Sequence, residues 1–415
     1  MTDDLPPLDP PPVVAAVTMG YGHLRAAVSI SDALGVSVAR ADRAPLATWL
    51  ERRVWAAARA GYHGLSRVSQ ERRLGPVCRG ALDRLTAIED RTAGSPSPAA
   101  VVALDGLVRL GLGAELGRRL DAAGAPLVAT FYAIALAAAR HSRVPVACVV
   151  TDSDIHRVWA PAEPRASRIR YLVPVAATAD RLLGYGVARR RISVTGFPLP
   201  PELVGGDDLG VLRTNLATRL ARLGRSDSPL HVVIAIGGAG THADRALAAA
   251  RELEGELAAG RVRLTLAAGT REEVADRFRR GIAAGLSKAA GRAVAVLCEP
   301  RFEAASRRFT EALAGADALW TKPSELVFYG ALGLPLILEP AVGDHEHRNR
   351  ELVVSPGIAA DRPEPGTVVR WLDRRRREGW FVEAAARGPE QLEPRGAGAI
   401  AAFVSSELYE RFTGV

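Results

Sequence analysis

The 415-residue chain is poor in several features that mark particular protein classes. Its three cysteines, Cys78, Cys148 and Cys298, show neither paired nor metal-ligand spacing, so we interpret them as structural and expect no metal site. No apolar run approaches the length that spans a bilayer, and segment 1–12 is acidic and proline-rich, unlike a signal peptide. These absences predict a cytoplasmic protein with a disordered tail over residues 1–12.

Lysine is almost absent. Of the 54 Lys and Arg residues, only Lys288 and Lys322 are lysines. Since arginine supplies nearly every other positive charge, we interpret the compact ammonium of Lys322 as selected for its position. The net charge of +8 is spread along the chain with few interleaved aromatic residues, which argues against a nucleic-acid partner. Nucleotides, phosphorylated acceptors and anionic lipid surfaces all fit the charge.

Length and hydrophobic patterning predict an α/β protein of two domains. A chain of 415 residues with 48% hydrophobic content suits two domains of roughly 200 residues each. Short apolar runs alternate with helical segments, as in doubly wound parallel sheets. The predicted strands are 13–17, 101–104, 127–130, 146–150, 169–173, 230–236, 262–267, 294–297, 316–320 and 336–338. We predict an N-terminal domain over 13–200, a linker over 201–229 and a second domain over 230–395.

Polar residues follow the predicted strand 316–320 at a turn into a helix. Pro323 suits a first helical position, Ser324 and Glu325 bring oxygens to the first turn, and Gly333 ends the helix. The N–H groups of such a helix start favour phosphate, and Lys322 adds a point charge beside them. Further along, His345, Glu346 and Asn349 form a cluster of hydrogen-bonding side chains.

Two glycine turns open helices after predicted strands. Gly20, Gly22 and His23 follow strand 13–17, where backbone N–H groups can face a ligand and an imidazole can accept a hydroxyl proton. A helix-capping role for His23 is the alternative. The second turn can approach a diphosphate and comprises Gly237, Gly238, Gly240 and Thr241. It lacks the G-K-[ST] sequence of a P-loop.

Polar residues also follow strand 146–150, in the sequence T-D-S-D-I-H-R-V-W. Asp152 could orient or assist a base, and His156 could contact an acceptor or a diphosphate. A capped turn, in which Asp152 satisfies backbone donors, explains the same residues equally well. Segment 43–91 is helical and rich in arginine, with Trp49 and Trp55, and is either a membrane-docking surface or a solvated helix pair.

Four motifs resemble those of family 28-type glycosyltransferases of the GT-B fold, chiefly the monogalactosyldiacylglycerol synthases, the processive diacylglycerol glucosyltransferases and the N-acetylglucosaminyltransferase that makes lipid II. They are T-M-G-Y-G-H-L-R-A-A from Thr18, T-D-S-D-I-H-R-V-W from Thr151, I-S-V-T-G-F-P from Ile192, and K-P-S-E with G-L-P and H-E-H-R-N from Lys322. The resemblance covers most of the chain from Val13 to Asn349.

The resemblance implies two Rossmann-like domains facing across a cleft, with a C-terminal helix over 396–415 that returns to the first domain. It also implies that a sugar is transferred, with inversion, from a UDP-linked nucleotide diphosphate-sugar to a hydroxyl of a lipid or small-molecule acceptor. With a lipid acceptor, the reaction would take place at the inner face of a membrane. The sugar nucleotide is a co-substrate, and no cofactor is expected. His23 and Asp152 are then the catalytic candidates, and Gly20, Gly22, His156 and Trp159 contact the acceptor or the diphosphate. The donor set is Gly237, Gly238, Gly240, Thr241, Lys322, Ser324, Glu325, His345, Glu346 and Asn349.

The donor motif departs from the family pattern in one place. The segment between Lys322 and Gly333 is two residues shorter than expected, so the usual ribose-binding glutamate falls on Phe328. A non-catalytic sugar-nucleotide binding protein is therefore a second hypothesis. A sugar-nucleotide epimerase, which would recruit Glu325, Glu346 and Asp152, is a third.

Overall fold

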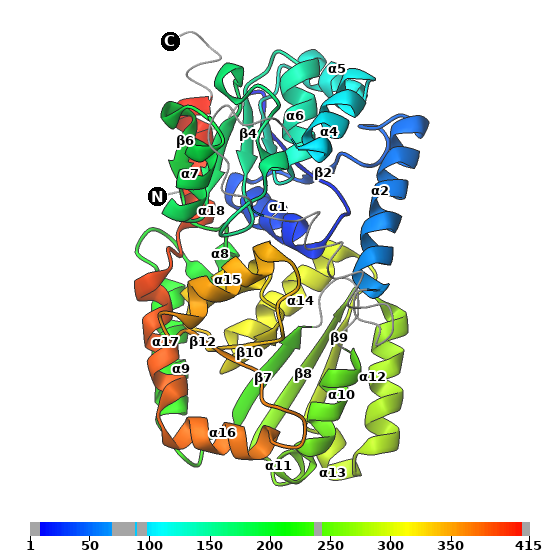
Figure 1. The fold of residues 1–415 in the computed structure, drawn as a ribbon. Coiled ribbons are helices and arrows are strands. Elements are labelled where there is room, and N and C mark those ends of the chain that lie inside the picture. Colours follow the sequence, from blue (N-terminus) through cyan, green and yellow to red (C-terminus); the bar gives the residue numbers. More distant parts are fainter. Residues whose placement is uncertain (1–8, 69–87, 89–97, 236–242, 409–415) are drawn as a thin grey trace. The chain divides into compact units, whose positions relative to one another are not determined.

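The computed structural model describes residues 9–68, 88, 98–235 and 243–408, without the side chains of 62–68 and 407–408. The chain divides into two units, which are described separately. Unit 1 comprises Met1–Pro201, Val342–Arg348 and Glu393–Val415, and unit 2 comprises Glu202–Ala341 and Asn349–Leu392. Each unit holds one six-stranded sheet (Figure 1).

The sheet of unit 1 is parallel, with the strand order β2-β1-β3-β4-β5-β6. Its strands are β1 (Val13–Ala16), β2 (Val38–Arg40), β3 (Leu127–Ala129), β4 (Val146–Val149), β5 (Arg170–Val173) and β6 (Ile192–Val194). The helices are α1 (Tyr21–Leu34), α2 (Trp49–Val68), α4 (Ala99–Arg109), α5 (Ala114–Ala123), α6 (Tyr132–His141), α7 (Ala176–Gly184) and α18 (Gly396–Phe403), with short turns η2 (Arg157–Trp159), η3 (Pro164–Ala166), η4 (Arg189–Arg191) and η6 (Val404–Leu408).

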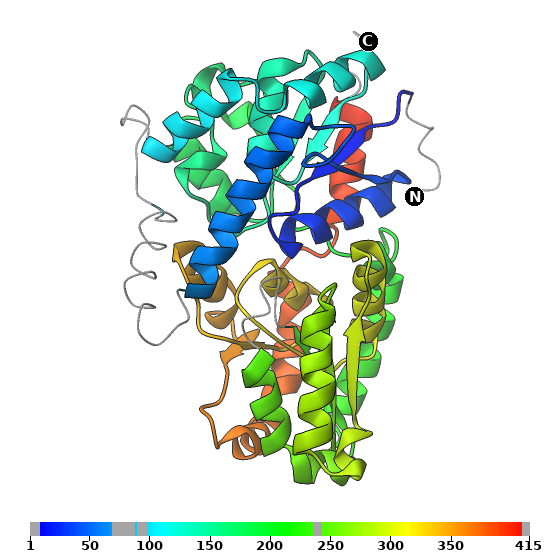
Figure 2. The same cartoon turned by 90° about the vertical axis from the view of Figure 1, so that its right-hand side faces the viewer.

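Helices cover both faces of this sheet (Figure 2), which explains why β3, β4 and β5 are buried at every position. The C-terminal helix α18 packs against α1 and so belongs to unit 1. Its first residue must be glycine, because a Cβ at Gly396 would lie 2.2 Å from the carbonyl oxygen of Phe197.

The sheet of unit 2 is also parallel, with the order β12-β11-β10-β7-β8-β9. Its strands are β7 (Leu230–Ala235), β8 (Val262–Gly269), β9 (Val294–Cys298), β10 (Ala318–Thr321), β11 (Leu336–Leu338) and β12 (Ala359–Asp361). The helices are α8 (Pro201–Val204), α9 (Gly210–Leu223), α10 (Ala243–Glu252), α11 (Glu254–Ala258), α12 (Glu272–Gly285), α13 (Lys288–Gly291), α14 (Phe302–Ala314), η5 (Glu325–Leu332), α15 (Asp344–Val354), α16 (Val368–Arg377) and α17 (Trp380–Gln391). The first residues of α15 belong to unit 1 and the remainder to unit 2.

A buried arginine anchors α9 in unit 2. Arg219 is 1% exposed and donates hydrogen bonds to the carbonyls of Ala316 (2.7 Å), Leu332 (2.7 Å), Gly333 (3.2 Å) and Leu313 (3.3 Å). Burial lowers the pKa of its guanidinium to about 10. Because these carbonyls end α14 and η5, one side chain ties α9 to both segments that flank β10.

The structure differs from the sequence-based expectations in four places. Residues 101–104, predicted as a strand, lie in α4, where Val101 and Val108 are buried seven residues apart on one helix face. The segment 201–229, predicted as a linker, contains α8 and α9. Strands β2, β6 and β12 were not among the predicted strands, because each has three residues of which one is polar or charged (Arg40, Ser193 and Asp361). The helix after β10 is a 3-10 helix that begins at Glu325, so Pro323 precedes it by two residues.

Within the described ranges, no helix is both long and apolar enough to cross a membrane.

Candidate functional site

The carboxyl end of β1 leads into α1 through the predicted glycine turn. The N-cap residue, Gly20, has φ −174° and ψ 164°, an extended conformation open to any residue. A Cβ built on Gly20 would meet no atom within 4 Å. Neither the turn nor the packing therefore requires glycine at this position, and the open space lets a ligand approach the backbone of the helix start.

The ring of His23 is held by residues that follow other strands of the same sheet. Its Nδ1 lies 2.7 Å from the carbonyl oxygen of Thr130, after β3, and 3.2 Å from the hydroxyl of Thr151, after β4. A carbonyl oxygen can only accept, so Nδ1 carries the hydrogen and the lone pair of the neutral ring is on Nε2. The Thr130 hydroxyl in turn donates to the backbone carbonyl of His23 (2.8 Å). These bonds orient the ring across the strand ends, which differs from the capping role considered as an alternative.

Aromatic rings surround the imidazole. The His23 ring meets Phe131 edge-on at 4.9 Å between centroids and lies 6.2 Å from Trp159. Trp159 also contacts Tyr132 at 5.1 Å and is only 2% exposed. Trp159, predicted as an acceptor contact, therefore lies in the core and supports the neighbouring rings; it offers almost no open surface.

The acidic turn after β4 contains two aspartates with different surroundings. Asp152 is half-buried, and its backbone carbonyl accepts a hydrogen bond from the Thr178 hydroxyl (3.4 Å). Asp154 is 8% exposed, accepts two bonds of 2.9 Å from Arg181 and accepts the N–H of Ile155 (2.8 Å). A backbone donor of this turn, the N–H of Ile155, is thus satisfied by Asp154.

His156 lies half-buried beside this turn, with its Nδ1 enclosed. Its ring packs edge-on against Tyr132 at 6.0 Å, and its Nδ1 has no hydrogen-bond partner among the described residues. Burial, and then the charge of His345, lower the pKa of His156 to about 4. At neutral pH the ring is therefore uncharged, so it can exchange hydrogen bonds with a ligand but brings no positive charge to a diphosphate.

In unit 2, the turn after β10 is held by main-chain and amide contacts. Ser324 donates its N–H to the carbonyl of Lys322 (2.8 Å) and precedes η5 without a side-chain capping bond. Asn349 is fully buried and donates its amide to the carbonyl of Pro323 (3.3 Å). Glu325 is 8% exposed, whereas Lys322 and Ser324 are half-buried. Asn349 therefore shapes the turn, and Lys322 and Ser324 are its more accessible side chains.

The structure does not bring the whole predicted donor set into one unit. Lys322, Ser324, Glu325 and Asn349 belong to unit 2, whereas His345 and Glu346 belong to unit 1. Glu346 is 4% exposed and accepts the N–H of Val342 (2.9 Å), a local bond at the start of α15. The remaining donor residues, Gly237, Gly238, Gly240 and Thr241, lie outside the described residues.

A charged cluster that the sequence patterns did not predict lies at the carboxyl end of the sheet of unit 2. Glu339 follows β11 directly, is 4% exposed and accepts hydrogen bonds from the indole of Trp320 (3.0 Å) and from Arg245 (2.8 Å). Arg362, after β12, lies 3.2 Å from the same carboxylate. One carboxylate and two guanidiniums leave a net charge of +1. An acid immediately after a predicted strand, as Glu339 is after 336–338, was the signal available in the sequence.

Arg245 is the accessible member of this cluster. It lies in the first turn of α10, its side chain is 48% exposed, and Glu339 fixes one end of its guanidinium. Among the described residues, no group of three His, Cys, Asp or Glu side chains gathers as metal ligands. The candidate groups are thus an oriented imidazole in unit 1 and the cations Lys322 and Arg245 in unit 2.

Neither a family model nor a curated protein matches the sequence. The structure is similar to MurG from Acinetobacter baumannii, with a TM-score of 0.53 and 14% identity over 95% of this chain and 99% of the other. It is also similar to a putative UDP-N-acetylglucosamine 2-epimerase from Listeria monocytogenes, with a TM-score of 0.51 and 11% identity over 96% of each chain. The two parallel sheets with helices on both faces and this similarity establish a GT-B fold of two Rossmann-like α/β domains.

Proposed function

We propose that this GT-B protein is an inverting glycosyltransferase that moves a sugar from a UDP-linked nucleotide sugar to a hydroxyl of a lipid or small-molecule acceptor. The observation that carries the proposal is the orientation of His23. The Thr130 carbonyl accepts the Nδ1 hydrogen at 2.7 Å, which makes Nε2 the basic nitrogen at the ligand-binding edge of a parallel sheet.

In the proposed reaction, Nε2 of His23 accepts the proton of the acceptor hydroxyl while that oxygen attacks the anomeric carbon. The bond from the anomeric carbon to the diphosphate oxygen breaks on the opposite face, so the configuration inverts. The Thr130 carbonyl, bonded to Nδ1–H, stabilises the imidazolium that forms. Asp152 remains a candidate for assisting this base.

The leaving nucleoside diphosphate develops negative charge, and positively charged side chains of the protein would stabilise it. Lys322 supplies an ammonium next to the start of η5. Arg245, fixed by Glu339 at 2.8 Å, supplies a guanidinium in the first turn of α10. Both cations follow strands at the carboxyl edge of the unit 2 sheet, the edge at which α/β sheets bind ligands.

An exposed apolar corner of unit 1 supports a lipid acceptor and contact with an anionic membrane. Trp49, Leu50 and Leu110 are 63%, 58% and 87% exposed. They belong to one corner, because the Glu51 carboxylate accepts the N–H of Gly113 at 2.8 Å and thereby joins the start of α2 to the turn after α4. Exposed apolar groups among arginines are typical of helices that enter a membrane interface.

The test combines calorimetry with UDP and turnover of a panel of UDP-sugars. We expect His23→Ala to abolish turnover and leave UDP affinity nearly unchanged, whereas Lys322→Ala weakens UDP binding about tenfold, the loss of roughly 1.4 kcal/mol. Lys288→Ala is the matched control, since Lys288 is the only other lysine and is exposed in unit 2. If both variants bind and turn over substrate as the parent does, the assignment is wrong.

A non-catalytic binding protein is the second candidate, favoured by the altered donor segment. Phe328, at the position expected for a ribose-binding glutamate, is 3% exposed, and Glu325 is 8% exposed. Tight UDP binding without consumption of any UDP-sugar would favour this candidate. An epimerase is the third, and interconversion of the 2-epimers of a UDP-sugar would identify it.

A further inference from the structure

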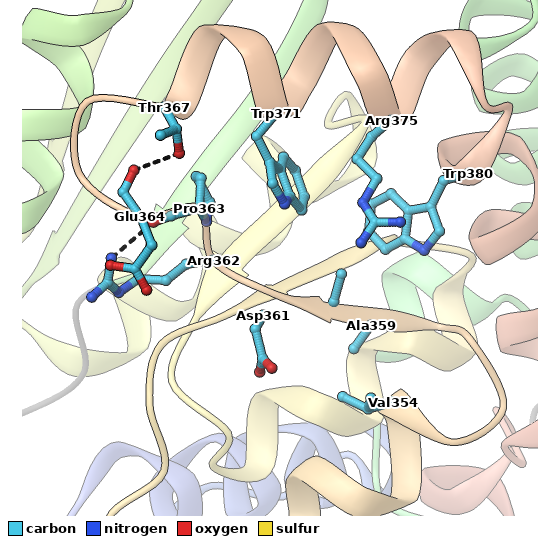
Figure 3. Close-up of a pocket in the computed structure, with 11 residues that line it drawn as sticks. Val354, Ala359, Asp361, Arg362, Pro363, Glu364, Thr367, Trp371, Arg375 and Trp380 are labelled. Carbon is cyan, nitrogen blue, oxygen red and sulfur yellow. Dashed lines mark hydrogen bonds between the residues drawn. The ribbon is translucent and has the colours of Figure 1, made fainter.

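Unit 2 contains a hollow that the proposed function does not use. It has a volume of about 580 Å³ and lies between the edge strand β12 and the helix α16 (Figure 3). Known ligand sites range from about 300 to 1,000 Å³. Its lining comes from the end of α15, β12, the loop that follows it, α16 and the start of α17.

One wall of the hollow is the open edge of the sheet. Among the described strands, β12 is the last in the order and pairs with β11 alone. The Ile358 carbonyl and the Arg362 N–H bond to β11, so the backbone groups of Ala359 and Asp361 face the other way, because groups alternate along a strand. Ala359 and Asp361 both line the hollow. The edge can therefore accept another extended chain.

The opposite wall presents a cation held on aromatic faces. The guanidinium of Arg375 lies 5.3 Å from the ring of Trp371 and 5.4 Å from that of Trp380. Among the described residues, its Nε has no hydrogen-bond partner, and its nearest carboxylate is Glu378 at 3.6 Å, longer than a hydrogen bond. In Figure 3 this side chain points from α16 toward Ala359.

Of the three other charged residues in the lining, Glu364 lies in the loop after β12 and the remaining two are paired. Asp361 accepts a hydrogen bond of 2.7 Å from Arg350, and Arg362 lies 3.2 Å from Glu339. Arg375 is therefore the lining cation with no described carboxylate at hydrogen-bond distance, and a carboxylate is the group that complements it.

We propose that this hollow docks an extended peptide segment of a partner protein, which pairs its backbone with the outer edge of β12 and places a carboxylate against Arg375. The indoles of Trp371 and Trp380 exclude water from one side of that ion pair and restrict the position of the guanidinium. The lining shares Arg362 with the charged cluster described above, but Arg375 and the edge residues Ala359 and Asp361 take no part in the proposed reaction, so the docking proposal does not depend on it.

The probe is a set of blocked six-residue Thr/Val peptides with one glutamate at each position in turn, matched by glutamine peptides. We expect the best glutamate peptide to bind the full-length protein about fivefold more tightly than its glutamine counterpart, as expected for a partly exposed ion pair. N-methylation of alternate residues should abolish binding, because it removes the N–H donors that pair with β12. Hydrogen exchange should show protection of Ala359 and Asp361.

In Arg375→Gln, the ratio of affinities for the glutamate and glutamine peptides should fall to near one. Arg375→Lys should retain part of the preference for glutamate. The control is Arg370→Gln, an exposed arginine of the same helix outside the lining, which should bind as the parent does. Thermal unfolding of each variant separates loss of binding from loss of folding. The proposal fails if no glutamate peptide outbinds its glutamine partner, if Arg375→Gln keeps the preference, or if protection appears away from β12.

Discussion

Acid should destabilise unit 1 through His156. The pKa of this ring is about 4, against an ordinary value of 6.5. Above pH 6.5 the ring is neutral in both the folded and the unfolded chain, so it adds no pH dependence. Between pH 6.5 and 4 the unfolded chain binds a proton that the folded unit does not, so the free energy of unfolding falls as pH falls. At about 1.36 kcal/mol per pKa unit, the loss reaches about 3 kcal/mol near pH 4 and then levels off.

The perturbation is His156→Gln, which removes the titrating group and keeps a polar side chain at the same half-buried position. Hydrogen exchange of β4 and β5, corrected for intrinsic rates at pH 7, 5.5 and 4, reads the stability of unit 1. Between pH 7 and pH 4, we expect the free energy of unfolding to fall by about 3 kcal/mol less in the variant than in the parent. His347→Gln, at an exposed position, is the control and should follow the parent. Equal acid sensitivity in parent and variant would refute the burial of this imidazole.

Three further predictions concern buried hydrogen bonds. Thr130→Val removes the hydroxyl that donates to the backbone carbonyl of His23 at 2.8 Å. The free energy of unfolding of unit 1 should fall by roughly 1 kcal/mol, and UDP-sugar turnover should fall several-fold. Unchanged turnover would contradict the orienting role of this bond. Glu339→Gln should lower the unfolding free energy of unit 2 by about 2–4 kcal/mol in urea titrations, because it leaves Arg245 and Arg362 beside a neutral amide; a loss below about 1 kcal/mol would argue against the cluster. Arg219→Met should lower the free energy of unfolding of unit 2 by about 3 kcal/mol in the same assay, because it leaves buried carbonyls unsatisfied. A stabilised variant would show that the cost of burying the charge exceeds the gain from its hydrogen bonds.

Local sequence patterns predicted the helices and strands correctly where an element was long or strongly apolar. The runs at 127–130, 146–150 and 230–236 became β3, β4 and β7, because strands buried on both faces are apolar at every position. The strand predicted at 101–104 was wrong, since a short apolar run fits a buried strand and a helix equally well. The three-residue strand β12 carried no such pattern, although its open edge forms a wall of the hollow.

Candidate site residues were predicted with the same unevenness. Sequence placed His23 at a strand-to-helix turn, and the structure has it in the first turn of α1. It selected Asp152, yet Asp154 makes the buried ion pair with Arg181, because two aspartates two residues apart cannot be ranked without their neighbours. It also grouped Lys322 with His345, which belong to different units.

By itself, the sequence determined the two-domain α/β class of the chain and the strand ends at which polar residues gather, because burial periodicity and glycine turns are local properties. The GT-B fold was implied only by the resemblance of its motifs to a known family. Only the tertiary structure decided the chemistry at those ends. The tautomer of His23 depends on Thr130, 107 residues away, and the placement of Arg245 depends on Glu339, 94 residues away. Such contacts follow from the order in which strands pair within each sheet, and strand order is not a property of any single segment.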